Sequence, residues 1–456
     1  MSLQESDLLP RKRCDELMLA VQAAAYRHGV HDVEVLLSAS EESLTRFANN
    51  AIHQNVSERG IILSVRTVIG NRTARASTNR LHRDGVSAAV DEAIALTRAS
   101  DPVPNAPPLY EGGGDVELEH SRWSKASAEC TPADRAHGVA DAIRVVESHH
   151  QTAAGIYAVA ENVEVILNSR GVSRYYTDTL STFSITAMAG DSSGWAKATS
   201  AHHEDVRPLE LAERAARKAD LSRNPRELAP GPYTVILEPS AVLDLVGQIF
   251  GDFSANAIND QRSFLNGRLG EKLFGDNITI YDDVRFPLQT GAPFDGEGVP
   301  RQTLTLVKRG VPQKLVYSRE SAARDGMQPT GHGYPLPNEL GESPTNIVIA
   351  GGKSSLADII AGTGNGILVT RLWYIREVEP YAKVMTGMTR DGTFLVKDGE
   401  VVAGLKNFRF NQSVVELLKN VECLGASERA TGEEAFDMVV PAMKIRDFHF
   451  TEVTKF

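Results

Sequence analysis

Apolar and polar residues recur along the first half of the chain with two different periods. Apolar residues at every third or fourth position predict a helix, and strict alternation predicts a half-buried strand. Helices are predicted at residues 14–26, 84–98, 131–148 and 209–218, and strands at residues 31–38, 60–69, 72–77, 163–168 and 181–189. Thr131, Pro132 and Asp134 form the start of a capped helix. The polar segment 41–58 alternates loosely and has room for another strand.

The strand predicted at residues 163–168 resembles the strand at residues 33–38. Both begin with Val-Glu-Val, and both are followed by polar residues, further strands, a glycine turn and an Ala-rich helix. An internal duplication of a strand–strand–strand–helix unit explains this repeat. Strand-rich segments also resemble one another by composition alone, so both interpretations stay open.

Residues 221–232 mark the boundary between two domains. The segment contains three prolines and a glycine, and it separates two periodic regions. A chain of 456 residues is also too long for one ordinary hydrophobic core. We therefore predict an α+β protein with two domains. Residues 1–224 form an N-terminal α/β domain, and residues 231–456 form a strand-rich C-terminal domain that opens with a helix.

The opening helix of the second domain is predicted at residues 239–253. Its apolar residues lie at mixed three- and four-residue spacings, which indicates that most of its surface is buried. Ser240 is the predicted N-cap, which places Asp244 near the positive end of the helix dipole. The helix contains no histidine and no cysteine. Further along, strands are predicted at residues 277–282, 302–307, 314–317, 393–396, 400–402 and 443–453, and a short helix at residues 414–420.

Composition narrows the class of function. A net charge of −11 argues against nucleic-acid binding, which usually requires a basic face. The three cysteines are widely spaced and odd in number, which indicates a reducing compartment without disulfides. The sequence shows neither a signal-peptide core nor a run of about 18 apolar residues. We therefore expect a cytoplasmic protein that does not span a membrane.

The histidine clusters have simple structural interpretations. His202-His203-Glu204-Asp205 contains metal-binding residue types, but adjacent residues point apart, whereas ligand pairs usually lie about four residues apart on a helix. The cluster also precedes a predicted helix, so a solvated helix entry is the favoured interpretation. His149 and His150 are predicted to lie at a helix C-terminus, where positive charge suits the dipole.

Glycine-flanked loops hold the remaining candidates for chemistry. Asp295 and Glu297 are two carboxylates in one such loop, and His332 lies between two glycines. Residues 362–366, which include Thr363 and Asn365, form a glycine-rich turn that precedes a strand and lacks the lysine of a phosphate loop. Each loop is typical of an ordinary turn, and also of close backbone approach to a ligand.

Six segments of the second half, taken in order, resemble the TldD/TldE family of bacterial peptidase subunits, in which TldE is also called PmbA. They are GEGVPRQTLTLVKRGV (residues 296–311), PTGHG (329–333), GTGNG followed by ILVTRL (362–372), TGMTRDGTFLVKDGEVV (386–402), LLKNVECLG (417–425) and VVPAMKIRDFHF (439–450). The first half fits as well, with VEVLLSASEESLTRFANNAIHQN and a strand that carries Gly60 and Arg66. The resemblance therefore covers nearly the whole chain, and it implies the two-domain TldD/PmbA-like fold.

Active TldD-like members carry His-Glu-x-x-x-His on the first helix of the second domain. There the two histidines bind zinc together with a C-terminal cysteine, and the Glu can serve as general base. Leu243, Asp244 and Gln248 match the motif positions in this chain, and Thr431-Gly432 stands near the cysteine position. Leucine cannot bind zinc and glutamine is a poor ligand. The chain thus resembles the zinc-free TldE/PmbA branch, so we expect no catalytic residue and no cofactor in it.

The resemblance implies a non-catalytic subunit of a two-subunit zinc peptidase. The partner is then a TldD-like paralogue that carries the zinc, or a second copy of this chain, and the substrate is an unfolded or modified peptide bound by addition to a sheet edge. Asp295, Glu297, His332, Thr363 and Asn365 are the predicted lining of the peptide path. Asp244 is a candidate for a hydrogen bond across the subunit boundary.

Two alternatives remain at this stage. A paralogous pair of this type can instead hydrolyse a small peptidyl conjugate in specialised metabolism. The other alternative is a regulatory or binding protein without peptidase activity, in line with the family's older link to DNA gyrase. The acidic charge argues against direct DNA binding in that case.

Overall fold

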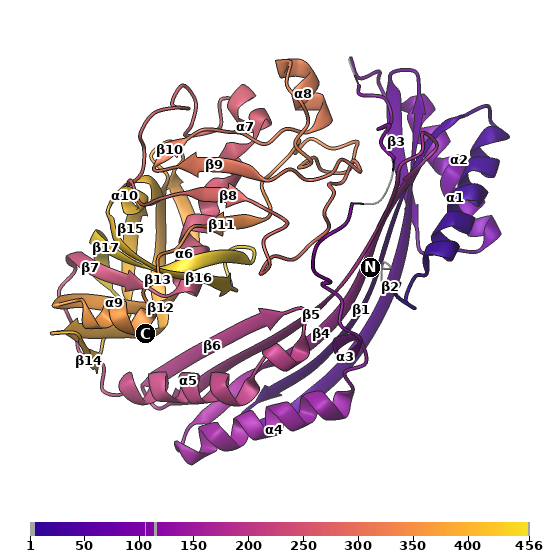
Figure 1. Cartoon of the computed structure of the whole chain (residues 1–456). Coiled ribbons are helices and arrows are strands. Elements are labelled where there is room, and N and C mark those ends of the chain that lie inside the picture. Colours follow the sequence, from indigo (N-terminus) through magenta and orange to yellow (C-terminus); the bar gives the residue numbers. More distant parts are fainter. Residues whose placement is uncertain (1–4, 105, 114–115, 455–456) are drawn as a thin grey trace.

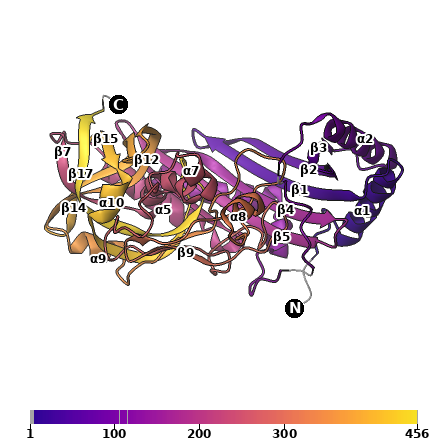
Figure 2. The ribbon, with the colours of Figure 1, turned by 90° about the horizontal axis from the view of Figure 1, so that it is seen from above.

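A computed structural model describes residues 5–104, 106–113 and 116–454 of the chain. It places a long curved sheet with its helices beside a second, strand-rich region (Figure 1). Seen from above, the helices α1 (Arg11–Tyr26) and α2 (Arg83–Ala99) lie at one end of the molecule, and the strand-rich region lies at the other end (Figure 2). The predicted α+β class is confirmed.

The N-terminal sheet has six antiparallel strands in the order β3-β2-β1-β4-β5-β6. The strands are β1 (Asp32–Ala48), β2 (Ala51–Ile69), β3 (Arg72–Thr78), β4 (Thr152–Asn168), β5 (Ser173–Ala189) and β6 (Ser192–Ser200). The accompanying helices are α3 (Lys125–Ala128), α4 (Pro132–Ser148), the 3-10 turn η1 (His203–Asp205) and α5 (Pro208–Leu221). The order α1-β1-β2-β3-α2 recurs as α4-β4-β5-β6-α5, and β1 lies antiparallel to β4 at the centre. An internal duplication would produce this arrangement.

Alternation along the strands gives the sheet two different faces. Odd-numbered residues such as Val33, Val35 and Val65 are fully buried in a core with α1 and α2. A second core packs α4 and α5 against the other half of the same face. On β1, β2 and β4, even-numbered residues such as Leu36, Ser64 and Glu164 therefore point to the opposite, inner face of the curved sheet, which lies beside the C-terminal domain (Figure 1).

The C-terminal domain is built on an eleven-stranded sheet around one large apolar core. Its strands are β7 (Gly231–Leu237), β8 (Ile280–Asp282), β9 (Leu304–Lys308), β10 (Val311–Pro312), β11 (Ile347–Ile349), β12 (Asn365–Glu379), β13 (Val384–Lys397), β14 (Glu400–Gly404), β15 (Phe408–Ser413), β16 (Val421–Ala430) and β17 (Met438–Val453). Its helices are α6 (Pro239–Val246), the 3-10 segment η2 (Gly247–Phe253), α7 (Ala255–Asn259), α8 (Arg319–Asp325), α9 (Leu356–Ala361) and α10 (Val414–Lys419).

Three local predictions were wrong. The helix predicted at residues 239–253 ends at Val246 and continues as a 3-10 segment. Its N-cap is Glu238 rather than Ser240, since Pro239 occupies the first turn and the Ser240 hydroxyl instead donates to the carbonyl of Thr431 at 2.9 Å. The second strand of one hairpin lies at Val311–Pro312 rather than at residues 314–317, directly after the turn.

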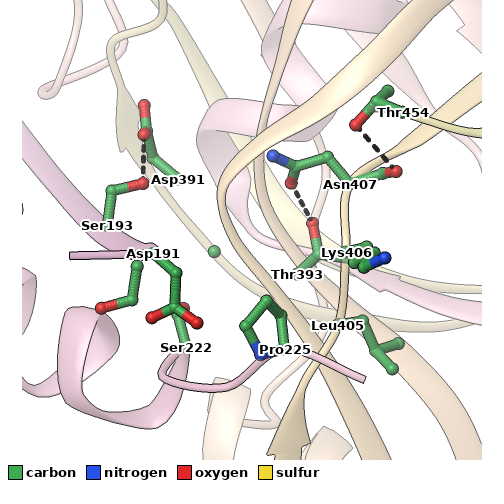
Figure 3. Close-up of a pocket in the computed structure, with 12 residues that line it drawn as sticks. Asp191, Ser193, Ser222, Pro225, Asp391, Thr393, Leu405, Lys406, Asn407 and Thr454 are labelled. Atoms are coloured by element: carbon green, nitrogen blue, oxygen red, sulfur yellow. Dashed lines mark hydrogen bonds between the residues drawn. The ribbon is translucent and has the colours of Figure 1, made fainter. Parts of the chain in front are cut away.

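Hydrogen bonds join the two domains at several points. Arg174 Nε donates to the carbonyl of Gly298 at 3.1 Å, and Arg75 Nε donates to that of Leu336 at 2.9 Å. Close to the boundary, a polar pocket of about 210 Å³ contains the bond from the Ser193 hydroxyl to Asp391 Oδ1 at 2.7 Å (Figure 3). These contacts hold the inner face of the sheet against the C-terminal domain.

Candidate functional site

Helix α6 presents the three positions that match the zinc motif to the loop before β17. Leu243 and Asp244 are fully buried, and Gln248 follows α6 in the 3-10 segment. A Cβ atom on Gly432 in the loop would lie 2.2 Å from Asp244 Oδ1 and 2.5 Å from Leu243 Cδ2. The loop therefore packs directly onto Leu243 and Asp244, two of the positions that match the zinc motif.

Asp244 and Gln248 fasten this loop by hydrogen bonds, and we call the arrangement the carboxylate clamp. Asp244 Oδ1 accepts the backbone N–H groups of Glu433 at 3.0 Å and Glu434 at 2.9 Å. Gln248 Nε2 donates to the carbonyls of Glu434 and Asp244, both at 3.1 Å. Burial raises the pKa of Asp244 to about 6, although these two N–H groups oppose that shift. Asp244 is fully buried in its own chain, so a hydrogen bond across a subunit boundary, as predicted from the sequence, would require the loop to move.

The residues at the clamp do not fit a zinc ion. Leu243 has no donor atom, and the Gln248 amide already bonds two carbonyls. Asp244 Oδ2 is the one buried oxygen of the clamp carboxylate that lacks a hydrogen bond. Zinc in proteins usually takes three or four nitrogen, sulfur or oxygen ligands. Within the described residues, no group of three or more His, Cys, Asp or Glu side chains is placed to hold a metal ion.

Replacing Gly432 by alanine is expected to lower the free energy of unfolding by about 1–3 kcal/mol, since the added methyl group overlaps the clamp carboxylate. Urea denaturation measures the change. Gly364→Ala is the matched control, because a Cβ atom there meets no atom within 4 Å. Equal stability of the two variants would contradict the packing described for the clamp.

The loop that carries Asp295 lies far from the clamp along the chain and is almost fully buried. Asp295 Oδ1 accepts the N–H groups of Glu297 and Val299, and its Oδ2 accepts that of Gly333 at 2.8 Å. Burial raises the pKa of Asp295, while Arg301 and the three N–H groups oppose the shift. Asp295 therefore ties the two glycine-flanked loops together.

Glu297 is also buried, and it has a charged neighbour. Its Oε1 accepts the backbone N–H of Arg319 at 3.0 Å, and its Oε2 lies 3.7 Å from Arg319 Nη1. Burial and the nearby Asp295 carboxylate raise the pKa of Glu297 to about 8. A carboxyl group with this pKa is largely protonated at neutral pH.

His332 pairs with a buried carboxylate, that of Asp282. Its Nδ1 shares a hydrogen bond of 2.9 Å with the Thr330 hydroxyl, and its Nε2 lies 3.1 Å from Asp282 Oδ1. Burial alone would raise the pKa of Asp282, but His332, Arg301 and the N–H of Asn346 together lower it. Both side chains of the pair are fully buried, so this histidine supports the loop.

The structure does not bring the other two predicted site residues to this place. Thr363 is buried, and its hydroxyl donates to the carbonyl of Ile359 at 2.8 Å. Asn365 is exposed at the start of β12. Both lie beside α9, at the opposite side of the C-terminal domain from α8 (Figures 1 and 2). The 362–366 turn therefore belongs to the hairpins formed by β12, β13 and β14, and not to the site around Asp295 and His332.

A pocket of about 410 Å³ lies where the inner face of the N-terminal sheet meets the Asp295 and His332 loops. The sheet contributes residues of β1, β2 and β4, including Glu164. The C-terminal domain contributes Asp295, Arg301 and His332, among others. Glu164 and Arg301 were not among the predicted site residues. The sequence offers one signal for Glu164, its alternating position on the inner face of β4, and this position does not identify a ligand by itself.

Comparison with known proteins places this architecture among metallopeptidase-type folds. The model of the PmbA/TldA metallopeptidase C-terminal domain matches residues 230–452, that of the central domain matches residues 126–223, and that of domain 1 matches residues 33–97. The chain belongs to the PmbA/TldD family.

Named relatives and a solved structure agree with this assignment. A metalloprotease of Methanothermobacter thermautotrophicus is 25% identical over 70% of this chain and 72% of its own length. Metalloprotease PmbA of Escherichia coli O157:H7 is 23% identical over 82% of this chain and 83% of its own length. The crystal structure of TldE from Thermococcus kodakarensis superposes with a TM-score of 0.85 at 21% identity, covering 96% of this chain and all of that chain.

In the described part of the chain, every helix is too short or too polar to cross a bilayer.

Proposed function

We propose that this chain is the non-catalytic subunit of a two-subunit cytoplasmic zinc peptidase that acts on unfolded or modified peptides. The observation that supports this role is the carboxylate clamp. Two of the positions that match the His-Glu-x-x-x-His motif of active members, the general-base position (Asp244) and a metal-ligand position (Gln248), here bond the 433–434 backbone of the same chain. In this proposal the partner subunit supplies zinc and the activated water, and this chain supplies part of the chamber and of the peptide path.

The end of the β12–β13 hairpin has the composition of a subunit interface. Tyr374, Val378 and Tyr381 are 53%, 59% and 57% exposed, and the Arg376 guanidinium lies 4.6 Å from the centre of the Tyr374 ring. Tyrosine and arginine are enriched at interface hot spots. We call these four residues the hairpin patch. Glu434 of the clamp loop accepts the N–H of Tyr374 at 2.7 Å, so a partner docked here would sit beside the degenerate motif.

The peptide has a free sheet edge available on the N-terminal domain. Strand β3 pairs with β2 only from Leu63 onward, and within the described residues no strand pairs with the outer edge of β2 at residues 51–62. Each side chain from Ala51 to Gly60 is exposed. Unpaired N–H and C=O groups along such an edge can bind an extended peptide through its backbone, which suits substrates of varied sequence.

Val378→Glu is expected to weaken association with the zinc-bearing partner by roughly 30-fold, as the loss of an interface hot spot does. Biolayer interferometry with the purified partner measures the affinity. Leu340→Glu, at a residue that is 69% exposed in another loop, is the matched control and is expected to bind normally. Unchanged affinity of the Val378 variant would remove the hairpin patch from the proposed interface.

The proposed activity is tested by mixing the chain with its zinc-bearing paralogue and assaying two substrate sets, long unfolded peptides and small dipeptidyl conjugates. Cleavage of unfolded peptides only by the mixture supports the proposal. Cleavage restricted to the conjugates would favour a role in specialised metabolism. Inactivity of the mixture on both sets would contradict a peptidase role.

A further inference from the structure

The pocket between the sheet and the Asp295 and His332 loops has mostly apolar walls; we call it the interdomain pocket. Its sheet side consists of inner-face residues, namely Leu36, Ser38, Ile62, Ser64, Glu164 and Ile166. Phe294, Tyr334 and Pro335 line the opposite side. At about 410 Å³, it has room for one long side chain together with a stretch of peptide backbone.

Glu164 is the unpaired charge in this pocket. Its side chain is exposed, and the described part of the chain offers it neither a hydrogen bond nor an ion pair. Asp295, the other carboxylate that lines the pocket, accepts three backbone N–H groups. Partial desolvation by the pocket walls and the nearby Asp178 raise the pKa of Glu164, while the charge of Arg301 opposes the shift.

The charge of Arg301 opposes the rise in the pKa of Glu164, but the described side chains of the two residues do not form an ion pair. Arg301 lines the same pocket, but its Nε donates to the carbonyl of Ala292 at 3.2 Å and its Nη1 to that of Gly331 at 3.0 Å. No ion pair joins it to Glu164 in the described structure. Across the strands, Glu164 faces Ser38 on β1 and Tyr176 on β5, neither of which is a cation.

We infer that the interdomain pocket binds a lysine side chain of a peptide, with the aliphatic stem against the apolar walls and the ammonium group on Glu164. A mostly apolar pocket with an unpaired carboxylate on one wall matches a primary ammonium on a long methylene chain. This inference rests on the proposed function, because it names a side-chain preference for the peptides that the two-subunit enzyme receives.

The test is fluorescence anisotropy with the full chain and three labelled peptides. The first is an acetylated alanine pentapeptide with a central lysine. The second has norleucine in place of lysine, which removes only the ammonium group, and the third is the norleucine peptide with a free N-terminus. We expect the lysine peptide to bind at least about 10-fold more tightly than both others, and Glu164→Gln to abolish the difference.

Glu42→Gln is the matched control, because Glu42 is exposed on the inner face of β1 but does not line the pocket. It is expected to keep the full lysine preference. Equal binding of the lysine and norleucine peptides, an unchanged preference in Glu164→Gln, or no binding of any peptide would overturn the inference. Preferential binding of the peptide with the free N-terminus would also overturn it, since the ammonium would then come from the chain end.

The outcome can be separated from that of the proposed function. If the mixture of subunits cleaves norleucine and lysine peptides equally well and Glu164→Gln changes neither rate, only the pocket inference fails. If the lysine preference in binding depends on Glu164 but the mixture cleaves no peptide, only the proposed peptidase role fails.

Discussion

Replacing Glu34 by alanine is expected to lower the free energy of unfolding by about 3–5 kcal/mol, because it leaves a buried arginine without its counter-charge. Glu34 Oε1 lies 2.6 Å from Arg75 Nη2, and its Oε2 lies 3.6 Å from Arg66 Nη1. The side chains of Glu34 and Arg66 are each only 2% exposed. Arg75 also donates to the carbonyl of Leu336, so the same carboxylate steadies a contact between the two domains.

Urea denaturation of Glu34→Ala measures this loss. Glu41→Ala is the matched control on the same strand, because the Glu41 side chain is 44% exposed and its Oε2 lies 3.9 Å from Nη1 of Arg59, which is 54% exposed. An exposed pair of this kind contributes less than about 1 kcal/mol. Comparable losses in the two variants would contradict the larger stabilisation that we expect from the buried ion pairs of Glu34 with Arg66 and Arg75.

Glu297→Gln is expected to remove a large part of the pH dependence of stability. The pKa of Glu297 is about 8 in the folded chain, against an ordinary value of 4.5, so the folded state holds the proton more tightly than the unfolded state. The wild-type chain therefore loses stability as the pH rises from about 4.5 to about 8. At roughly 1.4 kcal/mol for each pKa unit, the loss over this rise is on the order of 5 kcal/mol. Glutamine mimics the protonated acid, so the variant does not lose this stability as the pH rises.

The measurement is the unfolding free energy of both proteins at pH 5, 7 and 9. The difference between them isolates Glu297, since other buried acids such as Asp244 titrate in both proteins. We expect the variant to gain stability relative to the wild type as the pH rises through this range. Parallel curves would show that Glu297 is ionised in the folded chain at neutral pH.

Much of the fold could be predicted from local patterns. The capping box of Thr131 and Asp134 depends on neighbouring residues, as does the pairing of the consecutive strands predicted at residues 393–396 and 400–402. Both are present in the structure. The early end of α6 and the long outer part of β2 were harder to predict. Residues 51–60 of β2 are exposed on both faces, so they carry no clear alternation. The C-cap of helix α6 is Gly247, where a Cβ atom would lie 2.5 Å from the Ala435 Cβ, a contact between residues far apart in the sequence.

The candidate site could be predicted only in part. The glycine-flanked loops of Asp295 and His332 were recognisable, and the structure brings them together through the bond from Gly333 to Asp295. Thr363 and Asn365 have the same glycine-rich context but belong to a turn on another side of the domain. Glu164 gains its place in a pocket only because a loop of the second domain folds over β4. A contact between residues so far apart in the sequence leaves no local pattern.

The central claim, that this chain is the zinc-free half of a two-subunit peptidase, is tested most directly by affinity purification of the tagged chain from its native host. Mass spectrometry and zinc analysis of the purified material then identify the partner and the metal. The account predicts a paralogue with His-Glu-x-x-x-His in near-equal amount and about one zinc ion per pair, as a single catalytic site would hold. Recovery of the chain alone as a homodimer with bound zinc would contradict it.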